Sequence, residues 1–268
     1  MPTVPFSPAL RKEYARLFES CVIRPTRLAE VDAVAKRLVD NRTRYEQVST
    51  SCGVPWPVVA VIHNMEASLN FKSHLHNGDP LTARTVQVPK GCPKIGQPPF
   101  TWEFSAADAL GMKKLNADTD WTVAGTLYVL EGYNGWGYRL FHPHVLTPYL
   151  WSGSDHYTSG KYVSDGTFSD TAVSKQTGAA VLLRRLAERG DIEFEDQPAP
   201  VDDEPLLVAF SKKLNPDPVK AEQARELQRW LNTHPGVFVL VDGVPGRRTS
   251  NAFRVVTGAF LPGDPMAA

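Results

Sequence analysis

The fold of this chain is decided by an almost uniformly apolar stretch, residues 58–68, which reads VVAVIHNMEAS. Pro55 and Pro57 precede it, and proline suits the first turn of a helix because the amide hydrogen that it lacks would have no partner there. A helix that is apolar on nearly every face crosses the interior of a domain. The stretch therefore predicts a buried central helix with one carboxylate, Glu66, near its C-terminal end.

Apolar residues continue at helical spacing on both sides of this stretch. Before it, Ser7 and Thr26 are the expected N-caps of helices over residues 10–21 and 27–52, and Gly53 is the expected stop of the second helix. After it, further helices are predicted over residues 105–116, 120–135, 169–190 and 219–234.

Two other segments interrupt the helical pattern. Residues 70–100 are rich in glycine and proline around a β-like run at 82–89, which predicts a loop and hairpin beside the central helix. Residues 191–217 are acidic and contain proline, as linkers do, so we expect a main domain over 1–190 and a module over 218–268. A unit of that size buries little core of its own, so the module should dock on the main domain. The expected fold class is mainly α with a small β hairpin.

The composition excludes several classes of protein. Of the 268 residues, 42% are apolar, enough for a sizeable core, and 29 basic residues balance 29 acidic ones. Zero net charge gives no general attraction toward nucleic acid, so we expect no such partner. The three cysteines contain no Cys-x-x-Cys pair, which argues against a zinc ribbon or a disulfide framework. Nowhere do about 18 apolar residues follow one another, so we expect no membrane insertion.

Glu66 is the first candidate for chemistry. A carboxylate at the end of an apolar helix loses solvation, which favours its protonated form and raises its pKa toward the range of a general acid. Cleavage of a glycosidic bond needs such a proton donor. The alternative is a glutamate that merely caps or pairs at the end of its helix.

Two short motifs add a resemblance. Residues 61–71, VIHNMEASLNF, resemble the catalytic segment of lysozyme-like muramidases and lytic transglycosylases, in which a helix ends in a glutamate followed closely by serine and an aromatic residue. Those positions are Glu66, Ser68 and Phe71. Residues 132–139, GYNGWGYR, are similar to the Tyr-Asn-Gly element that these enzymes place across the cleft from the acid.

The resemblance implies an α+β lysozyme-like domain that cleaves the β-1,4 bond between N-acetylmuramic acid and N-acetylglucosamine in peptidoglycan. It implies substrate contacts at six positions, although ordinary packing is the alternative for the aromatic ones: Ser68, Tyr133, Asn134, Tyr138, Trp151 and Tyr157. We expect no cofactor and no metal. We also expect a monomer, made in the cytoplasm without a signal peptide, that reaches the cell wall after release or secretion by another system.

The second catalytic group is left open by the sequence. Asp79 leads, because in lysozyme-like enzymes the second acid often comes from the hairpin after the helix of the first, although Asn-Gly-Asp-Pro is also ordinary turn chemistry. Glu103 is a further candidate for a base that activates water. A lytic transglycosylase needs neither, since the 6-hydroxyl of the sugar completes its reaction.

The C-terminal module carries a resemblance of its own. Residues 227–253 resemble the three-helix peptidoglycan-binding domain through Leu227, Gln228, Leu231, Asn232, Asp242, Gly243, Gly246, Thr249 and Ala252. That family usually continues into Phe-Gln, whereas this chain continues with VVTG. Most matched positions build the unit, so a purely structural role is the alternative to wall binding.

The sequence leaves other classes of function as alternatives to peptidoglycan cleavage. A zinc amidase or peptidase would use histidines near the acid (His63, His74 and His76), but no His-Glu-x-x-His motif is present. Ser154 and His156 lack the Gly-x-Ser-x-Gly context of a serine hydrolase. A chitinase or chitosanase remains an alternative, as does a wall-binding protein that does not cut.

Overall fold

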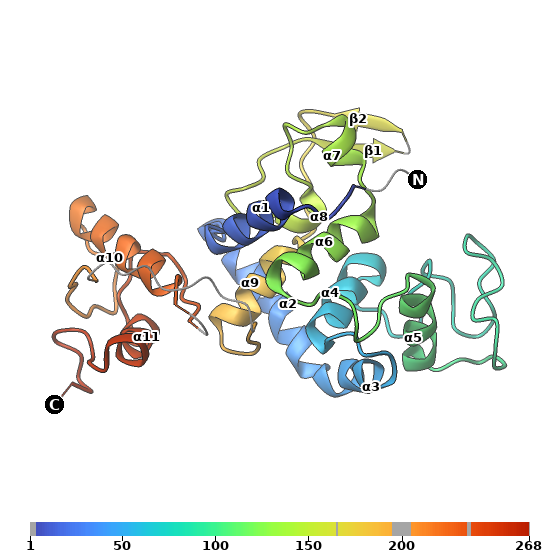
Figure 1. Cartoon of the computed structure of the whole chain (residues 1–268), viewed down its shortest axis with the longest axis horizontal. Helices are drawn as coiled ribbons and strands as arrows, with labels where there is room; N and C mark the ends of the chain where they lie inside the picture. Colours follow the sequence, from blue (N-terminus) through green and yellow to red (C-terminus); the bar gives the residue numbers. More distant parts are fainter. Residues whose placement is uncertain (1–3, 165, 195–204, 235–236, 268) are drawn as a thin grey trace.

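The computed structural model describes residues 4–164, 166–194, 205–234 and 237–267. The described chain is mainly helical with one two-stranded antiparallel hairpin, which confirms the predicted fold class (Figure 1). Its helices are α1 (Pro8–Glu19), the 3-10 helix η1 (Pro25–Arg27), α2 (Leu28–Asp40), α3 (Arg42–Cys52), α4 (Trp56–Ala67), α5 (Trp102–Met112), α6 (Val123–Asn134), α7 (Gly137–Phe141), α8 (Pro148–Trp151), α9 (Ala179–Glu188), α10 (Pro218–Leu231) and α11 (Arg247–Thr257). The hairpin pairs β1 (Lys161–Ser164) with β2 (Thr167–Ser169). No helix in the described ranges is both long and apolar enough to cross a membrane.

Helix α4 is the predicted central helix. Every residue from Val58 to Met65 is buried, and α2, α3 and α9 pack against it (Figure 1). Its N-terminal turn contains Pro57, as expected from the sequence. Because α4 is surrounded by other helices, its C-terminal end is the first place where one of its polar side chains, that of Glu66, meets solvent.

The helices before α4 match the prediction in part. Ser7 caps α1 as expected, its hydroxyl accepting the amide hydrogen of Leu10 at 3.2 Å. The single helix expected over 27–52 is instead two, because the chain breaks at Asn41, whose side-chain amide donates to a backbone carbonyl of the preceding turn. Thr26 lies inside η1 and is not an N-cap. Gly53 ends α3 with a positive φ of 75°.

The β-like run at 82–89 does not form a strand, so the hairpin predicted there was wrongly placed. Two of its amide hydrogens are taken by a side chain, since those of Val86 and Gln87 are donated to the carboxylate of Asp79. Val86 and Val88 are 69% and 88% exposed, so the run has no apolar face to bury against a core. The observed hairpin lies at 161–169, where the sequence Asp-Gly at 165–166 is a hairpin signal.

The C-terminal module packs around a small hydrophobic cluster of its own. That cluster contains Leu227, Leu231, Val237, Val239, Phe253 and Leu261, whereas Phe238 belongs to the large cluster of the main domain. The ring of Phe238 lies edge-on to Phe18 of α1 at 6.0 Å, so the module is joined to the main domain through this side chain. Of the three helices expected here, the described residues contain two, α10 and α11. Residues 195–204 of the predicted linker lie outside the described residues, and the domain boundaries stay a prediction.

Candidate active site

Glu66 lies in the last turn of α4 and is held by a tyrosine from another part of the chain. The hydroxyl of Tyr149, on α8, donates a hydrogen bond to Oε1 of Glu66 at 2.9 Å. Tyr149 is only 8% exposed, so this hydroxyl has a fixed position, whereas Glu66 remains open to solvent. The carboxyl group is therefore both oriented by the protein and reachable from outside.

The surroundings of Glu66 raise the pKa of its carboxyl group. Partial loss of solvation raises this pKa, while the hydrogen bond from Tyr149 and the positive charge of Lys113 lower it, and the net direction is upward. The acid form thus persists to higher pH than in an ordinary glutamate.

The chain turns sharply directly after Glu66. Ser68 and Leu69 have φ angles of 50° and 62°, the left-handed region that side chains other than glycine rarely adopt. Two such residues in succession cost free energy, and backbone strain of this kind clusters at functional sites. Ser68, one of the predicted substrate contacts, is exposed at this turn.

A cavity of about 300 Å³ lies beside Tyr149: its lining comes from α6 to α8, β1 and residues 174–176, and no residue of α4 lines it. Tyr149 and Gln176 line it, and both also contact the last turn of α4, since the side-chain amide of Gln176 donates to the carbonyl of Met65 at 2.9 Å. Two predicted substrate residues, Asn134 and Tyr138, line the same cavity. This volume is at the lower end of the range for small-molecule sites.

Tyr133 also lies next to the acid. The negative charge of Glu66 contributes to a raised pKa of the Tyr133 phenol, after the larger effect of burial. The ammonium of Lys113 lies 4.8 Å from the centre of the Tyr133 ring, and it also lowers the pKa of Glu66. The Tyr-Asn-Gly element and the acid are thus brought together.

Three of the six predicted substrate contacts are buried aromatic side chains: Tyr138 is 7% exposed but lines the cavity, whereas the other two do not line it. Trp151 is 1% exposed and Tyr157 is 3% exposed, so neither presents a ring face to a sugar in this structure. The Tyr157 hydroxyl donates to the carbonyl of Gly160 and accepts from the amide of Ser174. For both residues, the alternative of ordinary packing describes the observed surroundings.

The two candidates for a second catalytic group are engaged elsewhere. One carboxylate oxygen of Asp79 accepts hydrogen bonds from the amides of Val86 and Gln87 and from the side chain of Asn77. The bonds from Gln87 and Val86 hold the pKa of Asp79 below its usual range. Glu103 forms an ion pair with Arg44. The Asp79 carboxylate therefore stabilises the loop that contains it by hydrogen bonds. The ion pair of Glu103 with Arg44 joins α5 to α3.

The histidines near the acid have structural partners. His63 is fully buried against Tyr45, and burial lowers its pKa to about 4. His74 bonds through its two ring nitrogens to the hydroxyl of Ser105 and the carbonyl of Ala83. His76 bonds to Asp108.

The remaining predicted pair, Ser154 and His156, also lacks catalytic geometry. The Ser154 hydroxyl donates to the carbonyl of Trp151, and the His156 ring bonds to the carbonyl of Leu17. The His156 ring therefore does not serve the Ser154 hydroxyl as a base.

Three residues at this site were not found by sequence reasoning: Tyr149, Lys113 and Gln176. Tyr149 is two residues from Trp151, one of the predicted substrate contacts, but it lies in neither of the two motifs. Searches of protein-family models, of curated proteins and of solved structures each find no match to this chain.

Proposed function

We propose that this protein cleaves the β-1,4 bond between N-acetylmuramic acid and N-acetylglucosamine in peptidoglycan, with Glu66 as the general acid. One observation carries the proposal: an accessible carboxyl with a raised pKa lies at the end of a buried helix, fixed by Tyr149. Because the Tyr149 hydroxyl donates to Oε1, the acid form of Glu66 carries its proton on Oε2. That oxygen is the one that would protonate the leaving sugar oxygen.

The cavity beside Tyr149 supports a sugar substrate. Its lining combines aromatic side chains, Tyr138 and Tyr162, with hydrogen-bonding groups from Asn134 and Gln176. Aromatic rings pack on the apolar faces of sugars, while amides bond to hydroxyl and N-acetyl groups. Of the six positions that the resemblance implies, we propose four as substrate contacts: Ser68, Tyr133, Asn134 and Tyr138.

A lytic transglycosylase is the second candidate, favoured by a specific observation. An inverting hydrolase needs a second carboxyl about 6.5–9.5 Å away and a retaining one needs it at about 5–5.5 Å. Among the described residues, the two carboxylates considered for this role, Asp79 and Glu103, are bound to other groups. A reaction completed by the sugar's own 6-hydroxyl needs only Glu66, acting first as acid and then as base.

Mass spectrometry of peptidoglycan digests tests both candidates. Products with a reducing muramic acid end indicate hydrolysis, and 1,6-anhydromuramic acid indicates transglycosylation. Freed peptides would mean that another bond is cut, and a protein that binds the wall without releasing products would not be an enzyme. Parallel digestion of chitin oligomers separates a chitinase from a peptidoglycan enzyme.

The variant Glu66→Gln tests the role of the acid. It keeps the shape of the side chain but cannot donate the proton, so we expect the rate to fall by about 10²–10⁴-fold or more. Glu103→Gln is the matched control, because Glu103 pairs with Arg44 and not with the site, and its rate should stay within a few-fold of wild type. Near-normal activity of Glu66→Gln would contradict the proposal.

A further inference from the structure

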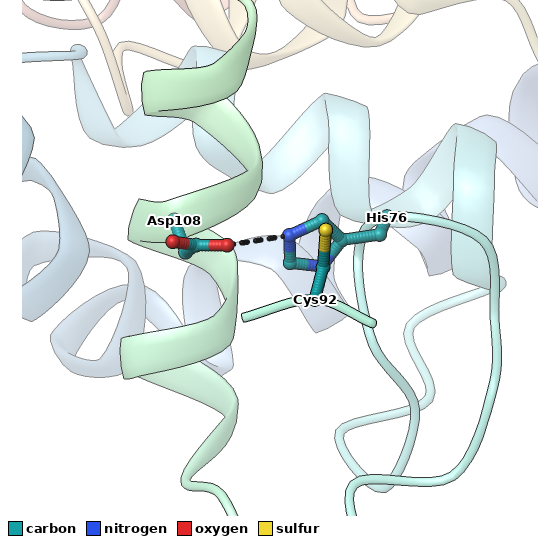
Figure 2. Close-up of side chains that lie close together, drawn as sticks. All are labelled: His76, Cys92 and Asp108. Carbon is teal, nitrogen blue, oxygen red and sulfur yellow. Dashed lines mark hydrogen bonds and ion pairs between the residues drawn. The ribbon is translucent and has the colours of Figure 1, made fainter. Parts of the chain in front are cut away.

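Three side chains that the proposed reaction does not use converge where the loop between α4 and α5 meets α5. Figure 2 shows His76 and Cys92, from two parts of that loop, facing Asp108 on α5. Their nearest nitrogen, sulfur and oxygen atoms all lie within 4.8 Å of one another. Nε2 of His76 and Oδ2 of Asp108 are 2.9 Å apart. These are three different kinds of metal ligand at one point.

We propose that His76, Cys92 and Asp108 form a binding site for a zinc ion. A donor set of one imidazole, one thiolate and one carboxylate suits a borderline-soft ion such as Zn²⁺, whereas Mg²⁺ and Ca²⁺ prefer oxygen ligands alone. When the ion binds, the Cys92 thiol loses its proton to solvent and the sulfur forms the bond to zinc. No oxidant or reductant takes part.

The spacing of the three ligands fits this ion after small movements. Zinc–ligand bonds of about 2.0–2.3 Å in a tetrahedron place the ligand atoms roughly 3.3–3.8 Å from one another. The His76–Asp108 pair, at 2.9 Å, would have to open slightly. A pair at the 4.8 Å limit of the cluster would have to close by about 1 Å.

The positions of the ligands are already fixed by neighbouring groups. The hydroxyl of Thr85 accepts the amide hydrogen of Cys92 at 2.8 Å, and the amide of Thr85 donates to the Cys92 carbonyl at 2.9 Å. Ser105, one turn before Asp108 on α5, lies 3.5 Å from Nδ1 of His76. Outer partners that hold ligands in this way are typical of metal sites.

The site is enclosed on one side and open on the other. Cys92 is 1% exposed and the His76 side chain is also 1% exposed, whereas the Asp108 side chain is 23% exposed and leaves a path for entry. The sulfur of Met112 lies 3.6 Å from that of Cys92. The fourth zinc ligand would be this thioether or a water molecule. Bound zinc would clamp the loop to α5, and its role would be structural.

Cobalt and zinc binding test the proposal directly. Protein freed of metal with a chelator and then titrated with Co²⁺ should develop the thiolate-to-cobalt charge-transfer band, and dialysis against Zn²⁺ should leave about one equivalent by elemental analysis. Cys92→Ser should abolish the band, and Asp108→Asn should weaken Zn²⁺ binding at least tenfold. Cys52→Ser is the matched control, because Cys52 is a free, partly buried cysteine outside the cluster.

Limited proteolysis is a second measurement, and it does not require the Cys92→Ser variant to fold. Zinc should slow proteolysis of the loop between α4 and α5 in the wild type, and this protection should be lost in Asp108→Asn. Wild-type protein that takes up neither Co²⁺ nor Zn²⁺ overturns the proposal. So does a charge-transfer band that persists in Cys92→Ser, or loop protection that Asp108→Asn keeps.

Discussion

Tyr149 and Glu66 form the pair of residues on which the proposed chemistry depends. The Tyr149 hydroxyl stabilises the ionised carboxylate, so Tyr149→Phe should raise the pKa of Glu66 further. A general acid works only while protonated, and the alkaline limb of the pH–rate profile should therefore move to higher pH. The measurement is the initial rate of peptidoglycan cleavage as a function of pH. Tyr157→Phe is the control, because that hydroxyl bonds to Gly160 and Ser174; an alkaline limb that moves down or stays in Tyr149→Phe contradicts the assignment.

The raised pKa of Glu66 also has a consequence for stability. The native state holds this proton more tightly than the unfolded chain, so the free energy of unfolding falls as pH rises from the unfolded pKa, about 4.3, through the folded value. Glutamine cannot ionise, and Glu66→Gln should therefore melt at a higher temperature than wild type at neutral pH. Below the unfolded pKa both carboxyl and amide are neutral, and the difference should shrink toward zero. Equal melting temperatures at pH 7 would show that the carboxyl is not desolvated.

At the scale of elements, the sequence predicted what depends on local pattern. The apolar run from Val58 to Met65 predicted α4, and the hydroxyl of Ser7 predicted the start of α1. The run at 82–89 has the residues of a strand, yet the amide hydrogens of Val86 and Gln87 go to Asp79, and Val86 and Val88 are exposed. The residue types of a segment indicate whether it suits a strand. They do not indicate which groups accept the hydrogen bonds of its backbone amides.

The short helix α8 depends on a glycine from a different element. A Cβ atom on Gly178, just before α9, would meet the carbonyl oxygen of Leu150 at 2.2 Å, so Gly178→Ala must push α8 and α9 apart. We expect a loss of stability of about 1–3 kcal/mol or more, and lower activity because α8 carries Tyr149. Gly111→Ala in α5 is the control, since nothing lies within 4 Å of that Cβ, and it should be neutral or stabilise by up to about 1 kcal/mol. The measurements are the thermal unfolding and the cleavage rates of the two variants. Equal stability of Gly178→Ala and the wild type would contradict the close approach of Gly178 to Leu150.

At the scale of the whole molecule, the sequence could indicate the candidate acid and Tyr133 but not the other groups around it. Glu66, Tyr133 and Asn134 were found because each lies in a local motif. Lys113 follows α5 and Tyr149 lies on α8, so only the tertiary fold brings them to Glu66. Similarly, the proposed zinc site joins residues that no sequence motif links. A site built from distant segments has no characteristic residue spacing in the sequence. Only the three-dimensional fold shows that its residues lie together.

Attachment of the C-terminal module depends on one buried cation. Arg184 is fully buried between α1 and the module, and its guanidinium donates to Glu188 at 3.0 Å and to the carbonyls of Phe18 and Val239. The same group lies over the ring of Phe238 at 5.4 Å. It therefore links the main domain to the module by hydrogen bonds and by contact with an aromatic face at the same time.

Arg184→Met keeps most of this volume but removes the charge, and it leaves the 1%-exposed Glu188 with a weaker pairing to Arg185 at 3.3 Å. Breaking a buried pair from one side costs about 3–5 kcal/mol, so we expect the free energy of unfolding to fall by an amount up to that range. With the link weakened, calorimetry should resolve two transitions, the module melting first. Arg229→Met is the matched control, because its pair with Glu222 is exposed and contributes at most about 1 kcal/mol. If Arg184→Met unfolds in a single transition at the wild-type temperature, the module is held to the main domain by its apolar contacts alone. Phe238 is then the residue to substitute next.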